Sequence, residues 1–305
     1  MKSRILFLGT GALVRTLMEV VVLNNESEIL GLITSAKEIS MGKSKEPIVN
    51  VHYTDLENFC SKHKIRYEIV SHLDSNKYLD EVISILHPDI VFVAGWHRLI
   101  SDSLLSKSNF YGFHASLLPK NAGWAPLVWA LINGEKETGV SLFKIDSGID
   151  TGPLIDQIKF PINENTTIHD LVDESIKISR ILLERNIKII SKGIEKLTPQ
   201  DLTKRTEGIR RVPSDGEINF CAPVRYVDRF IRAQTRPYFG SYTDIDQKRI
   251  RIFKSAIVDP SFKVHQGEYI EPGSHKVYND QYFFKCSDGW IQLLDFEVEE
   301  LRLSK

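Results

Sequence analysis

The stretch DIVFVAG, Asp89–Gly95, is the segment that most clearly indicates the fold. It is apolar almost throughout and shows no alternation of polar and apolar residues, which is typical of a strand covered on both faces. Strands of this kind belong to the parallel sheets of α/β proteins, where helices pack on each side. We therefore expect Asp89–Gly95 to lie inside a parallel sheet.

The chain on either side of this strand repeats a pattern of short apolar runs followed by helix-like stretches. Ser3–Gly9 ends in glycines and leads into the amphipathic stretch Ala12–Val22, which indicates a strand, a turn and a helix. Thr166–Lys192 has apolar residues at helical spacing and would close the first domain as a long helix. Further runs of the pattern are EILGLIT (28–34), TDLENFCSKH (54–63), YEIV (67–70) and YLDEVISILH (78–87). The sequence predicts an α/β fold with an open, doubly wound, mostly parallel, Rossmann-like sheet.

The last third of the chain has a different pattern. PVRYVDRFIRAQ (223–234) is helix-like, and the short strand-like runs that follow it are separated by Gly, Pro, Asn and Asp turns. We predict three parts: a catalytic domain at 1–193, a polar linker at 194–216, and a small β-rich domain at 217–305.

The composition excludes several classes of protein. With 305 residues, 42% hydrophobic and 26% charged, the chain is long and apolar enough for a globular protein with two domains. The formal net charge of −1 gives no basic field of the kind that drives binding to nucleic acids or membrane surfaces. The odd number of cysteines, Cys60, Cys221 and Cys286, argues against a disulfide framework, so we expect reduced, buried thiols.

The N-terminal apolar stretch predicts neither a signal peptide nor a membrane span, because Gly9, Gly11, Arg15 and Glu19 interrupt it. We expect a cytoplasmic protein. FLGTGALV (7–14) is similar to the start of a dinucleotide-binding loop, but Val14 stands where the third glycine would be, and no acidic residue ends the second strand. A nicotinamide dinucleotide is therefore not expected, while Gly9, Thr10 and Gly11 remain candidates for contact with a substrate phosphate.

His114 and Asp150 are the candidate catalytic residues. His114 follows the strand-like FYGF and precedes SLLP, which places it at the carboxyl end of a strand, the edge where open α/β sheets bind ligands. Asp150 stands in a second loop between glycines. A carboxylate beside an imidazole favours its charged form and fixes its orientation, so the pair could act as an acid or a cationic stabiliser.

Two other kinds of chemistry fit the sequence less well. A metal site would need a third ligand at a recognisable spacing from His114 and Asp150, and neither an HExxH motif nor a cysteine pair is present. A serine hydrolase would need a Gly-x-Ser-x-Gly elbow, which is absent around Ser116.

The segment from His114 to Ile155 resembles the folate-dependent formyltransferases, in particular the group of methionyl-tRNA formyltransferase and the sugar N-formyltransferases. The motifs that carry the resemblance are His114, Ser116–Pro119, Gly123–Pro126, Gly134–Glu135 with Thr138–Gly139, and Asp146–Gly152. The resemblance implies an N-formyltransferase that moves a formyl group from 10-formyltetrahydrofolate, its co-substrate, to an amine. His114 would stabilise or protonate the tetrahedral intermediate and Asp150 would keep it charged.

The resemblance also implies a folate site and a barrel-like, OB-type C-terminal domain. The folate would contact Trp96, His97, Arg98, Ser116, Leu117, Leu118, Pro119, Asp146 and Asp150. Trp124 and Trp129 would line or flank the acceptor cleft, although core packing of the helix that begins at Ala125–Pro126 explains Trp129 at least as well. Two departures stand out: Gly112 replaces the family's catalytic asparagine, and Asn121–Ala122 replaces an aromatic residue and an arginine.

The acceptor amine is less directly indicated. Residues 205–305 contain 16 Lys and Arg against 15 Asp and Glu, and the segment TSAKEISMGKSKEPIVN (34–50) has three lysines and no arginine, which is a poor surface for RNA. We therefore expect a nucleotide-linked amino sugar as the small-molecule acceptor, no nucleic-acid or membrane partner, and, by family analogy, a homodimer. The alternatives are a methionyl-tRNA formyltransferase and a non-catalytic folate-binding relative that lost its activity with the asparagine.

Overall fold

The computed structural model describes residues 2–24, 26–39, 48–70, 75–96, 98–262 and 270–301, with the backbone alone at 39, 48, 49 and 75. The chain forms two compact units. Unit 1 consists of Met1–Gly123, Thr138–Phe160 and Asp173–Glu207, and unit 2 of Trp124–Glu137, Pro161–Val172 and Gly208–Lys305. The domain boundaries expected from the sequence, 1–193, 194–216 and 217–305, stay a prediction.

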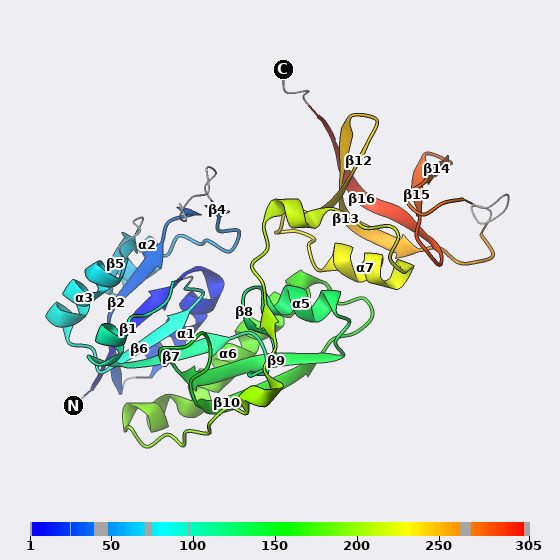
Figure 1. Ribbon diagram of the computed structural model, residues 1–305. Helices are drawn as coiled ribbons and strands as arrows, with labels where there is room; N and C mark the ends of the chain where they lie inside the picture. The colour runs from blue at the N-terminus through cyan, green and yellow to red at the C-terminus, as the bar shows by residue number, and fades with distance from the viewer. Residues whose placement is uncertain are drawn as a thin grey trace. The chain divides into compact units, whose positions relative to one another are not determined.

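The elements follow one another along the chain as labelled in Figure 1. The helices are α1 (Gly11–Leu23), α2 (Glu57–Lys62), α3 (Ser75–Leu86), α4 (Asp102–Leu105), α5 (Pro126–Ile132), α6 (Ile168–Ser191) and α7 (Val224–Arg232), with short 3₁₀ turns η1 (Leu202–Lys204) and η2 (Pro213–Gly216). The strands up to residue 161 are β1 (Ser3–Gly9), β2 (Ser27–Ser35), β3 (Glu38–Ile39), β4 (Ile48–Val49), β5 (Arg66–Val70), β6 (Ile90–Ala94), β7 (Asn109–His114), β8 (Ala122–Gly123), β9 (Glu137–Lys144) and β10 (Leu154–Pro161). The later strands are β11 (Glu207–Gly208), β12 (Ser241–Ile245), β13 (Lys248–Ile257), β14 (His275–Tyr278), β15 (Gln281–Lys285) and β16 (Trp290–Glu300).

Unit 1 is built on a seven-stranded sheet in the order β10-β9-β7-β6-β1-β2-β5. The pairs β7/β6, β6/β1, β1/β2 and β2/β5 are parallel, and β6 lies inside the sheet, as its apolar sequence predicts. The doubly wound, mostly parallel fold is therefore confirmed.

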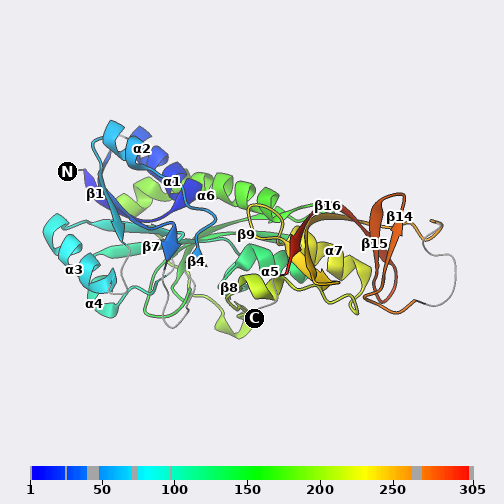
Figure 2. The same ribbon diagram turned by 90° about the horizontal axis from the view of Figure 1, so that it is seen from above.

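Helices cover both faces of this sheet, which explains why its central strands are apolar throughout. Figure 2 shows α1 and α6 on one face and α3 and α4 on the other. On the second face, the core cluster combines Leu79, Val82 and Ile83 of α3 with Val91 and Phe110 of the sheet. The sheet is thus a rigid base for the loops at its carboxyl edge.

One strand next to the candidate site departs from the parallel pattern. β9 pairs with β7 in the antiparallel direction, with His114 opposite Ser141 and Gly112 opposite Phe143. The end of β9 therefore lies beside the middle of β7, where the N–H of Ile145 donates to the carbonyl of Phe110 at 2.9 Å. The loop that follows must run back along β7 to approach His114.

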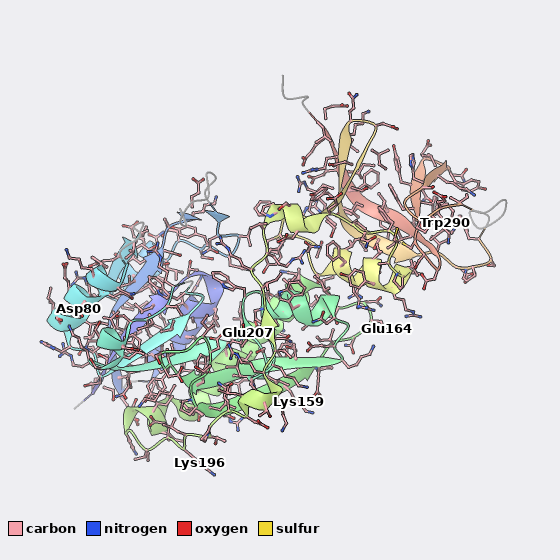
Figure 3. The ribbon with its side chains drawn as sticks, viewed as in Figure 1. Asp80, Lys159, Glu164, Lys196, Glu207 and Trp290 are labelled. Atoms are coloured by element: carbon pink, nitrogen blue, oxygen red, sulfur yellow. The ribbon has the colours of Figure 1, made fainter. Side chains whose placement is uncertain are left out.

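Unit 2 contains a five-stranded antiparallel sheet in the order β12-β13-β16-β15-β14, together with α7. Its core includes Trp290, labelled in Figure 3, and a stacked pair of Phe220 and Phe284 with ring centroids 4.8 Å apart. The expected small β-rich C-terminal domain is confirmed.

The cysteines agree with the prediction in two cases out of three. Cys60 and Cys286 are buried and free, whereas Cys221 is exposed, so the expectation of three buried thiols is wrong at that position. In the part of the chain that the structure describes, no helix has the length and apolar character needed to span a membrane.

A buried hydrogen bond that anchors β7 gives the first testable prediction. The hydroxyl of Tyr111, which is 1% exposed, donates to Oε1 of Glu195 at 2.7 Å. Tyr111→Phe would leave this carboxylate oxygen without its partner, so we expect the free energy of unfolding to fall by about 1–3 kcal/mol in urea titrations. Tyr278→Phe on strand β14 is the control and should change it by less than about 0.5 kcal/mol. Equal stability of the two variants would contradict the prediction.

Candidate active site

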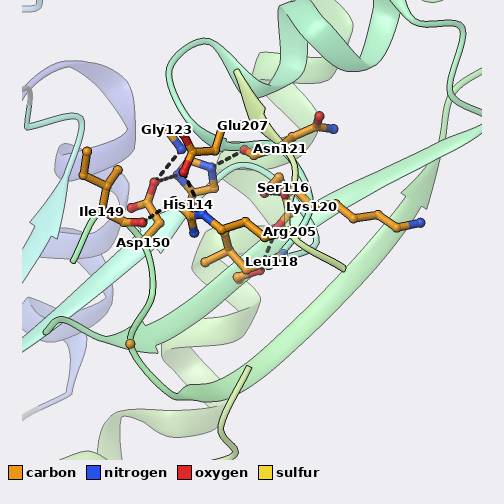
Figure 4. A network of polar contacts seen from close by, with 12 residues as sticks. His114, Ser116, Leu118, Lys120, Asn121, Gly123, Ile149, Asp150, Arg205 and Glu207 are labelled. Atoms are coloured by element: carbon orange, nitrogen blue, oxygen red, sulfur yellow. Dashed lines mark hydrogen bonds and ion pairs between the residues drawn. The ribbon is translucent and has the colours of Figure 1, made fainter. Parts of the chain in front are cut away.

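The imidazole of His114 lies between two hydrogen-bond acceptors at the end of β7 (Figure 4). Nε2 is 2.8 Å from the carbonyl oxygen of Asn121, and Nδ1 is 3.4 Å from Oδ2 of Asp150. The side chain of His114 is 11% exposed and that of Asp150 is 21% exposed, so both are largely shielded from water. A carbonyl and a carboxylate can only accept, so both ring nitrogens face acceptors.

Asp150 reaches His114 because the β9–β10 loop folds back on itself. Oδ1 of Asp146 accepts from the N–H of Gly148 at 3.1 Å and from the hydroxyl of Thr151 at 2.7 Å, which fixes the turn. Asp150 has a φ of 52°, in the left-handed region that non-glycine residues rarely adopt. Its Oδ2 also accepts from the N–H of Gly123 at 2.8 Å. The carboxylate is therefore held by a backbone donor as well as facing the imidazole.

The loop after His114 is fixed by Ser141, a fully buried residue of strand β9 that pairs with His114. Its hydroxyl donates to the carbonyl of Ser116 at 2.6 Å and accepts from the N–H of Leu118 at 3.0 Å. Gln157 adds a bond from Nε2 to the carbonyl of Leu118 at 2.9 Å. These buried contacts hold the SLLP segment in a single conformation beside the histidine.

Gly112, which stands where the family has its catalytic asparagine, faces an apolar wall rather than open space. A Cβ atom at this position would lie 2.6 Å and 2.7 Å from ring carbons of Phe143 and 3.3 Å from Cγ1 of Ile145. Phe143 packs there with Leu118 and Ala122 in one core cluster. The pocket is thus built around glycine, and an amide side chain has neither room nor a polar partner in that cluster.

The expected folate residues fall into two places of unit 1. Ser116, Leu117, Leu118 and Pro119 follow His114, and Asp146 shares the loop of Asp150. The hydroxyl of Ser116 is fully buried and donates to the carbonyl of Lys120 at 2.6 Å, so it serves the loop itself.

The second place is the segment that follows β6. Trp96 has a buried Nε1–H with no hydrogen-bond partner among the described residues, and Arg98 lies two residues further on. His97 lies outside the described residues. Because β6 and β7 are parallel neighbours, this segment leaves the same edge of the sheet as His114. The folate contacts themselves remain predictions.

The candidate substrate residues are divided between the two units of the chain. A Cβ atom at Gly11 would lie 2.4 Å from the carbonyl oxygen of His52, so this glycine permits a close backbone approach. Thr10 is buried and its N–H donates to the carbonyl of Ala94 at 3.3 Å, and Gly9 precedes it at the end of β1. Trp124 belongs to unit 2, where the guanidinium of Arg210 lies 5.4 Å from the centre of its ring. The role of these residues in substrate binding stays a prediction.

Several contacts of the site could not be recognised from the sequence. The carbonyl of Asn121 is a backbone group, and it points at His114 because Asn121 has a φ of 50°, a conformation that asparagine tolerates better than most residues. Gln200, Arg205 and Thr206 lie in the expected linker, yet all three form hydrogen bonds to the loops around His114. The polar residues that led us to predict a linker are the residues that form these contacts.

The fold is of the α/β class, and the comparison with known protein families is specific. The formyl transferase model matches residues 1–187, and the model for the formyl transferase C-terminal domain matches residues 211–303. The chain belongs to the formyltransferase family, as its sequence motifs predict.

Individual relatives agree with this assignment. The chain is 32% identical over 257 residues to the bifunctional polymyxin resistance protein ArnA of Wigglesworthia glossinidia brevipalpis; the match covers 83% of this chain but only 38% of that protein. It is 30% identical over 223 residues to the methionyl-tRNA formyltransferase of Caldanaerobacter subterraneus subsp. tengcongensis, covering 71% of this chain and 69% of the relative. A crystal structure of an N-formyltransferase from Helicobacter canadensis with folinic acid and dTDP-3-aminofucose has the same fold, with a TM-score of 0.69, 22% identity, and coverage of 96% of this chain and 99% of that one.

The packing around Gly112 makes a prediction about an obvious restoring mutation. Gly112→Asn forces Phe143 to move and buries an amide in an apolar cluster, so we expect the free energy of unfolding to fall by about 1–3 kcal/mol or more. Gly193→Asn is the matched control, because its added Cβ would meet no atom within 4 Å and asparagine tolerates its positive φ. Urea denaturation of the wild-type protein and the two variants checks the order, and a fully stable Gly112→Asn variant would contradict it.

Proposed function

We propose that this protein transfers a formyl group from 10-formyltetrahydrofolate to the amino group of a nucleotide-linked amino sugar. The observation that carries the proposal is the imidazole of His114, held between Asp150 and the carbonyl of Asn121 in a chain of the formyltransferase family. The sugar N-formyltransferase that was solved with an amino-sugar nucleotide shares the fold over nearly the whole chain, which supports the choice of acceptor.

In this proposal the folate supplies the formyl group, and the chain supplies the charge that makes it reactive. The lone pair of the uncharged acceptor amine forms the new C–N bond, and the electron pair of the formyl C=O bond moves to oxygen. The positive ring of His114 stabilises that negative oxygen by its charge, since Nε2 faces the carbonyl of Asn121, and Asp150 stabilises the positive ring. The oxygen then re-forms its double bond as the bond to the folate nitrogen breaks, and the proton lost by the amine balances the one that this nitrogen takes up.

One side chain near His114 along the sheet edge, that of Trp96, fits a bound folate. The buried Nε1–H of Trp96 has no partner among the described residues, and a polar edge of a bound heterocycle would satisfy it. Trp96 follows the strand next to that of His114, so one ligand could reach both.

The face of the C-terminal sheet supports a small acceptor rather than tRNA. The segment QKRIRIFK (247–254) is basic in sequence, but three of its four cations are matched by acids: Arg249 bonds both oxygens of Asp244 at 2.8 Å, and Arg251 bonds Glu299 at 2.8 Å. Lys248 lies 3.4 Å from Glu300. Cations that are already paired release few counterions from RNA, so they contribute little to its binding.

Two alternatives remain in the proposal. The 30% identity to a methionyl-tRNA formyltransferase favours tRNA as the acceptor. The apolar wall over Gly112 favours a folate-binding relative without turnover, because one missing donor to the oxygen costs about 10²–10³-fold in rate. The cytoplasmic location and the homodimer expected from the sequence also stay predictions.

The test of the acceptor is a formyl-transfer assay with 10-formyltetrahydrofolate, in which nucleotide-linked amino sugars and methionyl-tRNA are compared by the release of tetrahydrofolate. We expect turnover with one sugar nucleotide and a KM that changes less than about tenfold between 50 and 200 mM salt, whereas an RNA acceptor that contacts many phosphates loses about 10³–10⁵-fold in affinity over this range. Turnover with methionyl-tRNA alone would mean that the acceptor is tRNA and not a sugar nucleotide. Folate binding without turnover on any acceptor would favour the non-catalytic relative.

The histidine and the aspartate give a sharper prediction for the reaction itself. His114→Asn and Asp150→Asn should each lower kcat by roughly 10²–10⁴-fold, because the charged donor is lost or no longer stabilised, while folate binding measured by calorimetry persists. Asp102→Asn at the exposed start of α4 is the control and should leave kcat unchanged. Unchanged turnover in either active-site variant would remove the pair from the mechanism.

A further inference from the structure

The segment 198–206, which we call the supporting segment, is bonded along its length to the two loops that hold His114. It begins where Thr198 pairs with Leu154, with two N–H to carbonyl bonds of 2.8 Å. Asp201 then caps the short turn η1, as its Oδ1 accepts from the N–H and the hydroxyl of Thr203. The segment is thus an ordered part of unit 1 and has a defined conformation of its own.

Gln200 holds the backbone of the Asp150 loop. Its Nε2 donates to the carbonyl of Asp150 at 2.9 Å and to the carbonyl of Gly152 at 2.7 Å. Asp150 is in the left-handed region, which costs an ordinary residue about 1–2 kcal/mol relative to the right-handed one. The two bonds from one amide offset this cost and fix the direction in which the carboxylate leaves the backbone.

Arg205 holds the same loop at Ile149, one residue before Asp150. Its Nη2 donates to the carbonyl of Ile149 at 2.7 Å, and its Nε donates to Oε1 of Glu207 at 2.8 Å (Figure 4). The side chain of Arg205 is 15% exposed. Ile149 itself is exposed, so the loop at this residue is held through its backbone carbonyl more than through side-chain burial.

Thr206 holds the other acceptor of the histidine. Its hydroxyl accepts from the N–H of Asn121 at 2.8 Å, and its carbonyl accepts from the N–H of Ala122 at 2.9 Å. Asn121 is the residue whose carbonyl faces Nε2 of His114. One segment therefore fixes the backbone on both sides of the imidazole.

We propose that Gln200 and Arg205 are positioning residues for His114, acting through the backbone of the Asp150 loop. This inference rests on the proposed function, since the reaction places the charge of His114 at the formyl oxygen. Neither side chain is bonded to the imidazole or to the carboxylate of Asp150. They set the place of the carboxylate, and displacement of a reacting group by about 1 Å can cost 10²-fold in rate.

The test is a double-mutant cycle on turnover. Gln200→Leu and Arg205→Met should each lower kcat about 10- to 100-fold, with the KM for the acceptor little changed. In the Asp150→Asn background the same substitutions should have no further effect, because the group through which they act has been removed. Effects that multiply in full in this background would overturn the inference, since they would indicate a role that does not pass through Asp150.

A matched control separates positioning from stability. Asn186→Leu removes another buried amide of unit 1, whose bonds go to Asp156 at 2.9 Å and to the carbonyl of Leu182 at 2.8 Å, outside the loops around His114. It should lower the midpoint of thermal unfolding but leave kcat unchanged. Arg205→Met alters a partly exposed side chain, so it provides a folded variant if Gln200→Leu does not fold. A fall in kcat for Asn186→Leu equal to that for Gln200→Leu would contradict a specific role.

An NMR measurement keeps this inference separate from the proposed function. In protein labelled with ¹⁵N-histidine, the ring signals of His114, assigned by their loss in His114→Asn, should shift in Gln200→Leu and Arg205→Met in the same direction as in Asp150→Asn. They should not shift in Asn186→Leu. Unchanged ring signals in the first two variants would overturn the inference, whatever the acceptor is. The expected shifts in a protein without turnover on any acceptor would overturn the proposed function alone.

Discussion

The site depends on one interaction, the placement of the His114 imidazole between the carbonyl of Asn121 and the carboxylate of Asp150. Both partners are hydrogen-bond acceptors, and the low exposure of the pair strengthens the electrostatic interaction between the ring and the carboxylate. Each partner is itself held by backbone bonds, Asp150 by the N–H of Gly123 and Asn121 by Thr206. The loops around β7 therefore hold the imidazole in one orientation.

The apolar surroundings of Gly112 leave the proposed reaction without an amide donor at this position. Where the family places an amide, the ring of Phe143 packs with Leu118 and Ala122. This wall is apolar, and a charge acts over a longer range in a site of low polarity. In the proposed reaction the stabilisation of the formyl oxygen then falls mainly on His114, which explains why so many contacts are devoted to its position.

Much of the fold could be predicted from the sequence, because its signals are local. The unbroken apolar run of β6, the glycine-ended β1 and the long amphipathic α6 indicate a covered parallel sheet, and the structure has it. The pairing of His114 with Asp150 could also be predicted, from their loops. The antiparallel direction of β9 could not, because strand direction depends on pairing between distant segments. The wall over Gly112 and the bonds from Gln200 and Arg205 to backbone carbonyls have no sequence pattern, since a carbonyl is present at every residue.

The most direct test of the account is the stretching frequency of the formyl C=O bond in the bound folate, measured by isotope-edited infrared spectroscopy with a ¹³C-labelled formyl group and no acceptor. A positive charge close to the oxygen weakens this double bond. The account predicts a shift to lower frequency in the wild-type complex, most of which is lost in His114→Asn and Asp150→Asn while folate stays bound. The same frequency in the wild-type protein and in both variants would contradict the claim that the His114–Asp150 pair polarises the formyl group.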